Sequence, residues 1–239
     1  MSIPKLGYWD IQGLGQAIRM LLTYLDIEYE DIVYDNTIRS TTWMNEIKPN
    51  LGLDFPNLPY YKDGDLKLTQ SLAIIRYLGK KNGMYGKTAE ESAKIDMLME
   101  FGLDLVRGLV LGLAFKPDFV RFVIWLLKSL FFTFLNLQEK LKAGYIQKAE
   151  GEMKKLSDFL GNKKYFMGDN LTIADFQLRD PINWHRTLDE NLIKKFPNLL
   201  SYLDRFEEQP KIKEFLNGPK HFKHFFLSIA TWRGVWKIQ

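Results

Sequence analysis

Hydrophobic positions in the N-terminal third of the chain alternate between the spacing of strands and that of a helix. Lys5–Trp9 and residues 29–34 are short runs rich in aromatic or β-branched side chains, which predicts two strands. Between them, apolar residues recur at helical spacing on one face: Leu14, Ala17, Ile18, Leu21, Leu22 and Leu25. Residues 60–62 and 66–68 flank the hairpin signal Asp63-Gly64-Asp65, and Ser71–Lys81 is expected to be helical. The order β-α-β, then β-β-α, predicts a small α/β domain.

The pattern changes at residues 82–87, after which strand signals end and helical ones continue. Thr88-Ala89-Glu90-Glu91 has the form of a capping box and begins a helix that we expect to reach about Phe115. Thr172 to Asp175 form a second box, with Leu171 and Phe176 placed for a hydrophobic staple; we interpret both boxes as folding signals. Further helices are expected at 139–160, 174–188, 199–206 and 211–217. We therefore divide the chain into an α/β domain, 1–86, and an all-helical domain, 87–239.

Composition excludes several classes of protein. Of the 239 residues, 46% are hydrophobic and 26% charged, which is typical of a soluble globular protein. The chain has no cysteine, which excludes disulfides, cysteine-based zinc sites and cysteine nucleophiles, and the three histidines, His185, His221 and His224, argue against an all-histidine metal centre. The net charge of +4 comes without a basic tract interleaved with aromatic residues, which argues against nucleic acid as a partner. The N-terminus lacks the apolar run of a signal peptide, so we expect a cytoplasmic protein.

Three blocks of sequence resemble one known family. Residues 6–14 read LGYWDIQGL, residues 51–60 read LGLDFPNLPY and residues 69–71 read TQS, and the similarity continues at 166–169, 172–176 and 196–199. Together they resemble the cytosolic glutathione S-transferases of the mu class over nearly the whole chain. The resemblance implies an α/β thioredoxin-like N-terminal domain followed by an all-α helical C-terminal domain (the glutathione transferase fold) and a homodimer. It also implies a detoxifying transferase that conjugates glutathione, as co-substrate and without a metal, to hydrophobic electrophiles.

The resemblance places a catalytic hydrogen-bond donor at Tyr8, at the end of the first predicted strand. A free thiol has a pKa near 8.5, so only about 3% is thiolate at pH 7. Making half of it thiolate requires a fall of about 1.5 units, or about 2 kcal/mol, and one hydrogen bond to a charged acceptor contributes about 1.5–3 kcal/mol. A single neutral donor is therefore sufficient, and a phenol stays protonated at pH 7 because its ordinary pKa is near 10. The alternative is an ordinary tyrosine at a strand end.

The same resemblance assigns further residues to glutathione and to the dimer. Leu58 precedes Pro59, which is expected to be cis, and offers its backbone to the cysteinyl unit. Gln70 and Ser71 begin a helix whose free N–H groups suit the γ-glutamyl carboxylate. The other expected glutathione contacts are Trp9, Leu14, Trp43, Lys48, Asn57 and Asp104. Asp104 would reach the glutathione of the partner subunit, with a solvated helix acid as the alternative, and Phe55 resembles an aromatic knob at the dimer interface, with ordinary core as the alternative.

Two stretches depart from the class near these residues. Residues 34–43 are shorter than the usual mu-class loop and one residue is inserted after Trp43, so Lys48 and Arg39 are displaced from the positions that hold the glycyl carboxylate. Phe115 stands where many mu enzymes have a tyrosine that assists epoxide or enone substrates, and because phenylalanine cannot donate we expect weak epoxide opening. Phe115, Leu14, Leu103 and Arg107 are expected to line the electrophile site, with helix-core packing as the alternative for Leu103.

Residues 120–138 form an apolar block that the class does not have. Thirteen of its 19 residues are apolar and fall on all sides of a helix. A membrane span is disfavoured because the apolar stretch is shorter than the roughly 20 residues that spanning needs. The other interpretations are a true insertion over the site or a partner surface, and a retained intron, since removing the block restores the mu-class run PDFEKL. Because either this block or the shortened loop could spoil the cleft, a non-catalytic protein that binds glutathione or apolar ligands on the same fold is the alternative function.

Overall fold

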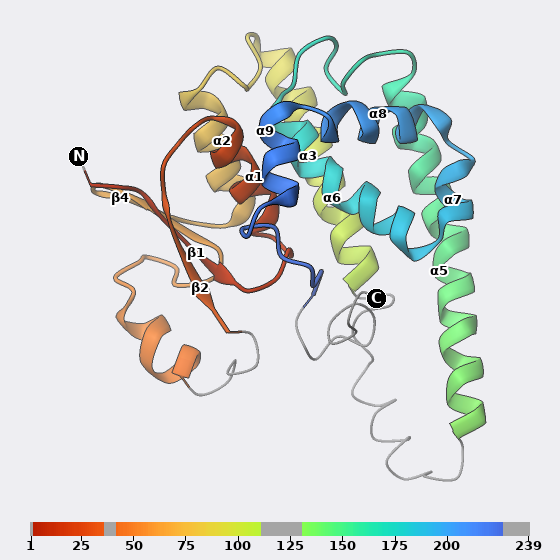
Figure 1. Ribbon diagram of the computed structural model, residues 1–239, viewed down its shortest axis with the longest axis horizontal. Helices are drawn as coiled ribbons and strands as arrows, with labels where there is room; N and C mark the ends of the chain where they lie inside the picture. Colours follow the sequence, from red (N-terminus) through yellow and green to blue (C-terminus); the bar gives the residue numbers. More distant parts are fainter. Residues whose placement is uncertain (1, 36–41, 111–130, 227–239) are drawn as a thin grey trace.

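The computed structural model describes residues 2–35, 42–110 and 131–226, and its N-terminal part is built on one four-stranded sheet (Figure 1). The strands are β1 (Lys5–Trp9), β2 (Glu30–Tyr34), β3 (Tyr60–Asp63) and β4 (Leu66–Thr69), in the order β2-β1-β3-β4. β1 and β2 are parallel and are joined through α1 (Gln16–Tyr24), whereas β3 is antiparallel to both β1 and β4. This is the topology that the β-α-β and β-β-α pattern predicted.

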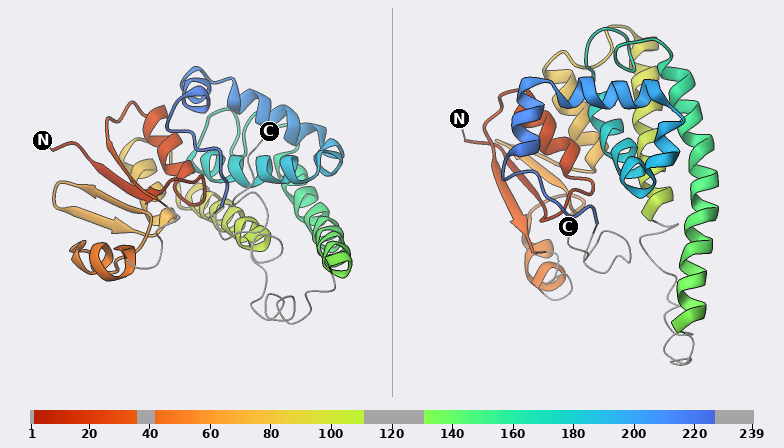
Figure 2. Two further views of the ribbon diagram at one scale, coloured as in Figure 1. Left: turned by 60° about the horizontal axis from the view of Figure 1, so that its bottom comes forward. Right: turned by 45° about the vertical axis from the view of Figure 1, so that its right-hand side comes forward.

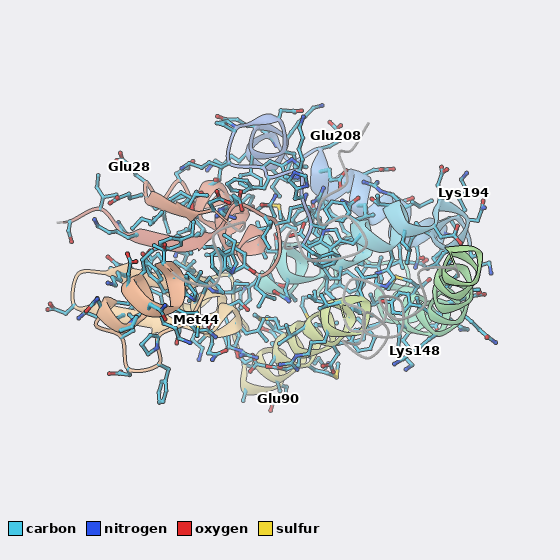
Figure 3. The ribbon with its side chains drawn as sticks, turned by 90° about the horizontal axis from the view of Figure 1, so that it is seen from below. Glu28, Met44, Glu90, Lys148, Lys194 and Glu208 are labelled. Atoms are coloured by element: carbon cyan, nitrogen blue, oxygen red, sulfur yellow. The ribbon has the colours of Figure 1, made fainter. Side chains whose placement is uncertain are left out.

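Side chains of the sheet contribute to two separate apolar clusters. Leu6 and Tyr61 belong to the main core, together with residues of α1 and α2 (Ser71–Lys81). Trp9 and Tyr60 point into a smaller cluster with Trp43, which lies in the helical turn η2 (Thr42–Ile47). The turn η3 (Lys48–Asn50) follows directly, and Figure 3 labels Met44, an exposed side chain of η2. Figure 2 shows η2 and η3, in orange, on the side of the sheet away from the helical part.

In the C-terminal part, all the elements named within the described residues are helices. Its helices are α3 (Ala89–Leu109), α5 (Phe131–Leu160), α6 (Ile173–Leu188), α7 (Glu190–Lys194), α8 (Pro197–Glu207) and α9 (Pro210–Asn217). α6 is the central element: it packs against α3, α7 and α8, and also against α1 of the N-terminal part. The boundary that we predict between residues 86 and 87 falls between α2 and α3, and it stays a prediction.

Both predicted capping boxes lie at the start of a helix, but they form differently. The Thr88 Oγ1 accepts a hydrogen bond from the Glu91 N–H at 3.2 Å, while the Glu91 carboxylate accepts from the N–H of Lys87 at 2.7 Å, one residue before the box. At α6 the Asp175 carboxylate accepts from the N–H groups of Thr172 at 2.8 Å and of Phe166 at 3.0 Å. Burial raises the pKa of the Asp175 carboxyl to about 6, although these hydrogen bonds oppose the rise.

The structure differs from the sequence expectations by a few residues at several helix and strand ends, and most clearly at α5, α7 and the turns η2 and η3. The helix expected from residue 139 begins at Phe131, so the last eight residues of the apolar block form the first turns of α5, the long helix at the right of Figure 2. α7 was not predicted because five residues are too few to show a helical period, and the turns η2 and η3 were not predicted either. Residues 111–130, with Phe115, lie outside the described part of the chain. Within that part no helix has both the length and the apolar character to cross a bilayer.

Candidate active site

Tyr8 lies near the end of β1, where the chain turns toward α1. Its ring is 5% exposed and packs in the smaller cluster with Trp9, Ile11 and Trp43. The phenol oxygen accepts a hydrogen bond from the N–H of Leu14 at 2.9 Å. The intervening Gly13 has a φ of +40°, and a Cβ there would lie 2.5 Å from the Tyr8 oxygen. The loop between β1 and α1 therefore wraps closely around the hydroxyl, which only glycine at this position permits.

The environment of Tyr8 keeps the phenol neutral. Burial raises its pKa above the ordinary value of 10.0, and the Leu14 hydrogen bond and the positive charge of Arg19 only partly offset this. Because the oxygen accepts from Leu14, the hydroxyl proton is available to a second partner, and no residue in the described part of the chain accepts it. Tyr8 is thus a fixed neutral donor at pH 7.

Arg19 supports this loop and was not picked out from the sequence. Its side chain is fully buried on α1 and forms an ion pair with Asp31 at 2.9 Å. The same guanidinium donates to the carbonyl of Ile11 at 3.0 Å and to that of Trp9 at 3.2 Å, and it lies 5.8 Å from the centre of the Tyr8 ring. Arg19 does not occupy a position of the predicted apolar stripe of this helix, so helical periodicity did not mark it as buried.

The sheet register gathers the residues that the resemblance assigned to glutathione. β1 pairs Gly7 with Tyr60, and β3 pairs Tyr60 with Thr69, so the segments 57–59 and 70–71 lie at one end of the β3–β4 hairpin, beside Tyr8. Leu58 is buried in the same cluster as Tyr8, and the Leu58–Pro59 peptide bond is cis, as expected.

The other assigned residues of the N-terminal part surround this point. Asn57 is exposed, Gln70 caps α2 with a φ of 70°, and Ser71 is the buried first residue of that helix. Trp9 and Trp43 pack edge to face with ring centres 5.6 Å apart, and Lys48 begins η3.

The remaining predicted residues are three on α3 and Phe55, the expected aromatic knob at the dimer interface. Asp104 and Arg107 are both exposed and pair with each other at 3.4 Å. Leu103 packs against the main core, which supports the alternative given for it. Phe55 is 77% exposed, so ordinary core packing is wrong for this residue. Arg39 and Phe115 lie outside the described residues.

A second apolar cluster adjoins Tyr8 through Leu14. Its buried members come from α3, from α6 and from the segment after α9: Val106, Leu109, Trp184, Leu188, Phe225 and Phe226. Leu14 packs against this cluster and also against the one that contains Tyr8. Sequence reasoning missed Trp184, Phe225 and Phe226, because no local pattern relates them to a loop near the N-terminus. Trp184, Phe225 and Phe226, which we name the aromatic wall, are almost fully buried and adjoin the neutral donor through Leu14.

Two family models match this chain, and each describes a domain of a known family. The family model "Glutathione S-transferase, N-terminal domain" matches residues 4–80, and "Glutathione S-transferase, C-terminal domain" matches residues 127–219. Glutathione S-transferase Mu 1 of Bos taurus is 38% identical over 232 residues, which cover 95% of this chain and 97% of the relative. The chain belongs to the glutathione S-transferase family. The glutathione S-transferase class-mu 26 kDa isozyme of Schistosoma mansoni is 39% identical over 220 residues, which cover 92% of this chain and 91% of that relative.

Solved structures agree with this assignment. The glutathione S-transferase Blo t 8 matches with a TM-score of 0.78 and 30% identity, over 95% of this chain and 98% of its own. The Pi-class glutathione S-transferase of Onchocerca volvulus matches with a TM-score of 0.73 and 26% identity, over 96% of this chain and 100% of the length of that structure. The predicted fold and the mu-class resemblance are confirmed, and relatives named as transferases favour the enzyme over the non-catalytic binding protein.

Proposed function

We propose that this glutathione S-transferase conjugates reduced glutathione to hydrophobic electrophiles and that Tyr8 is its catalytic residue. The observation that carries the proposal is the hydroxyl of Tyr8, which is buried, neutral and fixed by Leu14, and whose proton no described residue takes. A thiolate placed beside this hydroxyl would accept that proton as a hydrogen bond. Such a bond to a charged acceptor contributes about 1.5–3 kcal/mol, which lowers a thiol pKa by about one to two units.

The reaction then needs no general base at the sulfur. On binding, the thiol of glutathione releases its proton to solvent because the Tyr8 hydrogen bond favours the anion. A sulfur lone pair forms the new C–S bond with the electrophile, and in an aromatic substitution the leaving group departs with its bonding pair. Tyr8 keeps its own proton throughout, which its raised pKa favours.

Glutathione would lie across the end of the β3–β4 hairpin. The N-terminus of α2, at Gln70 and Ser71, presents free N–H groups and the positive end of the helix dipole to the γ-glutamyl carboxylate. The backbone of Leu58, before the cis Pro59, would hold the cysteinyl unit, and Trp9, Trp43, Lys48 and Asn57 would contact the rest. The common register of these segments beside Tyr8 supports this placement.

The hydrophobic electrophile would bind against the second cluster. Leu14 touches both clusters and so lies between the sulfur position and the aromatic wall. Of the other residues expected at this site, Arg107 is exposed on α3 and Leu103 faces the main core.

The active form would be a cytoplasmic homodimer with a role in detoxification, as the mu-class relatives suggest. Phe55 supports the dimer because a large apolar ring that is 77% exposed on one chain is buried if a second copy receives it. Asp104 is exposed on α3, so it would be available to the glutathione of a partner subunit.

Conjugation of 1-chloro-2,4-dinitrobenzene tests the proposal. Tyr8→Phe should lower kcat/KM about tenfold near pH 6.5, with a difference that shrinks toward pH 9, where thiols ionise without help. Tyr61→Phe is the matched control, because it removes a phenol hydroxyl from the neighbouring strand in the main core, and it should stay within about twofold of wild type. Equal pH profiles for wild type and Tyr8→Phe, or glutathione binding without turnover, would contradict the proposal.

A further inference from the structure

Gln12 joins the loop around Tyr8 to two distant parts of the chain. Its side chain is 2% exposed. The amide nitrogen donates to the carbonyl of Phe222 at 2.7 Å, and the amide oxygen accepts from the indole N–H of Trp184 at 2.8 Å. The backbone N–H of Gln12 donates to the carbonyl of His224 at 2.8 Å, and that of Gly13 donates to the carbonyl of Phe225 at 2.9 Å. Residues 221–226, which we name the C-terminal strap, are thereby fastened to the loop between β1 and α1.

The amide of Gln12 has a partner for each of its polar groups. Its second N–H lies toward the Nε2 of His221, with 3.4 Å between the nitrogens. The Nδ1 of His221 is 2.8 Å from the carbonyl of Leu216, to which it donates, so the Nε2 is left as an acceptor. A carbonyl needs a donor and an indole N–H needs an acceptor, and a glutamine amide supplies both from one neutral side chain. No acidic, basic or apolar side chain meets both requirements.

The strap carries two rings of the aromatic wall beside Tyr8. Phe225 stacks on Trp184 with ring centres 5.8 Å apart, and Phe226 meets Trp184 edge to face at 5.2 Å. These rings share a cluster with Leu14, whose N–H holds the Tyr8 hydroxyl. The strap has no helix or strand of its own, so its place depends on hydrogen bonds and ring contacts, among which the Arg19 guanidinium lies 4.4 Å from the centre of the Phe222 ring.

We propose that Gln12 is a positioning residue that sets the binding of the hydrophobic electrophile by fixing the C-terminal strap, and with it Phe225 and Phe226, against Trp184. The proposal rests on the conjugating activity proposed above. It assigns to Gln12 no role at the sulfur: the Tyr8 hydroxyl is held by the Leu14 N–H, which the Gln12 side chain does not touch. Loss of the amide should therefore weaken electrophile binding and leave thiol ionisation unchanged.

Gln12→Met keeps the length of the side chain and removes both polar groups. We expect KM for 1-chloro-2,4-dinitrobenzene to rise about five- to tenfold, while KM for glutathione and the pKa of the bound thiol stay at the wild-type values. Gln16→Met is the matched control. Gln16 is also fully buried, but both polar atoms of its amide lack a partner in the described part of the chain, so its loss should leave these constants within about twofold.

A second readout does not depend on turnover. Trp184 emission, taken as the difference between each protein and its Trp184→Phe counterpart, should change in Gln12→Met and stay the same in Gln16→Met, because Gln12 accepts from the indole N–H and the Gln16 amide has no hydrogen-bond partner in the described part of the chain. Gln12→Glu is the second variant should Gln12→Met fold poorly: it retains the acceptor for Trp184 and loses the donor to Phe222, so it should raise the electrophile KM and change the emission less.

Two outcomes overturn the inference. One is a lower Tm in Gln12→Met with both KM values unchanged, which means that Gln12 only stabilises the fold. The other is a shift in the pKa of the bound thiol, which means that Gln12 acts through Tyr8. Failure of the proposed function is distinguishable from both, because wild type itself would then show no conjugation whatever the emission of Trp184 does.

Discussion

Replacing Gly13 by alanine tests how closely the β1–α1 loop must fit the Tyr8 hydroxyl. The added Cβ would lie 2.5 Å from the phenol oxygen, whereas ordinary contacts begin near 3.4 Å, so one of the two groups must move by about 0.9 Å. The hydrogen bond from the Leu14 N–H to that oxygen is 2.9 Å long, and a shift of that size takes it out of hydrogen-bonding range. Tyr8 would keep its hydroxyl but lose the contact that aims it.

Gly64→Ala separates this effect from backbone strain. Gly64 has a φ of +60° in the turn between β3 and β4, and a Cβ there meets nothing within 4 Å, while Gly13 has a φ of +40°. Alanine in this left-handed region costs roughly 1–2 kcal/mol at either position. Both variants should therefore lose stability in urea denaturation, but only Gly13→Ala should lose activity.

The assay is conjugation of 1-chloro-2,4-dinitrobenzene near pH 6.5, at a temperature where both variants are folded. We expect kcat/KM of Gly13→Ala to fall at least about tenfold, which is a loss of about 1.4 kcal/mol in transition-state stabilisation. Gly64→Ala should remain within about twofold of wild type. If the two variants conjugate equally well, the close fit around the hydroxyl does not matter, and the account of how Tyr8 is aimed is wrong.

Three further predictions concern other parts of the chain. Phe55→Ser should convert a dimer into a monomer in sedimentation analysis, while Met44→Ser, another exposed apolar side chain, should not; a wild-type monomer would contradict the interface. Because the pKa of the Asp175 carboxyl is raised to about 6 from 3.8, the folded state binds its proton more tightly, and stability falls as pH rises through this range. The advantage of wild type over Asp175→Asn in urea denaturation should thus shrink by up to about 3 kcal/mol between pH 4 and pH 7, and an unchanged gap refutes the assignment. Phe115→Tyr should raise turnover of an epoxide more than that of 1-chloro-2,4-dinitrobenzene, and equal effects on both would show that the missing hydroxyl is not limiting.

Local patterns in the sequence predicted most of the fold. β1 and α2 have the predicted bounds, and α6 begins within one residue of the expected position, because clear periodicity and turn or capping residues mark their ends. The start of α5 was missed because an apolar run without a stripe carries no helical phase. α7 was missed because a single short turn shows no period.

Only those parts of the candidate site whose residues lie close together along the chain could be predicted from the sequence. Tyr8 and the segment around Pro59 lie in contiguous motifs, and the structure brings them together through the register of β1, β3 and β4. The strap could not be predicted, because the hydrogen bond from Gln12 to Phe222 joins residues 210 positions apart and leaves no periodic trace. Arg19 was not predicted either, because it falls beside the apolar stripe of its helix and its partner Asp31 lies 12 residues further along the chain.

The central claim is that one neutral phenol keeps a bound thiol ionised, and ultraviolet difference titration of the thiolate in the glutathione complex tests it most directly. The account predicts a bound thiol pKa near 7 in wild type, about 1.5 units below that of a free thiol, and a return to about 8.5 in Tyr8→Phe. A bound thiol that titrates near 8.5 in both proteins would contradict it.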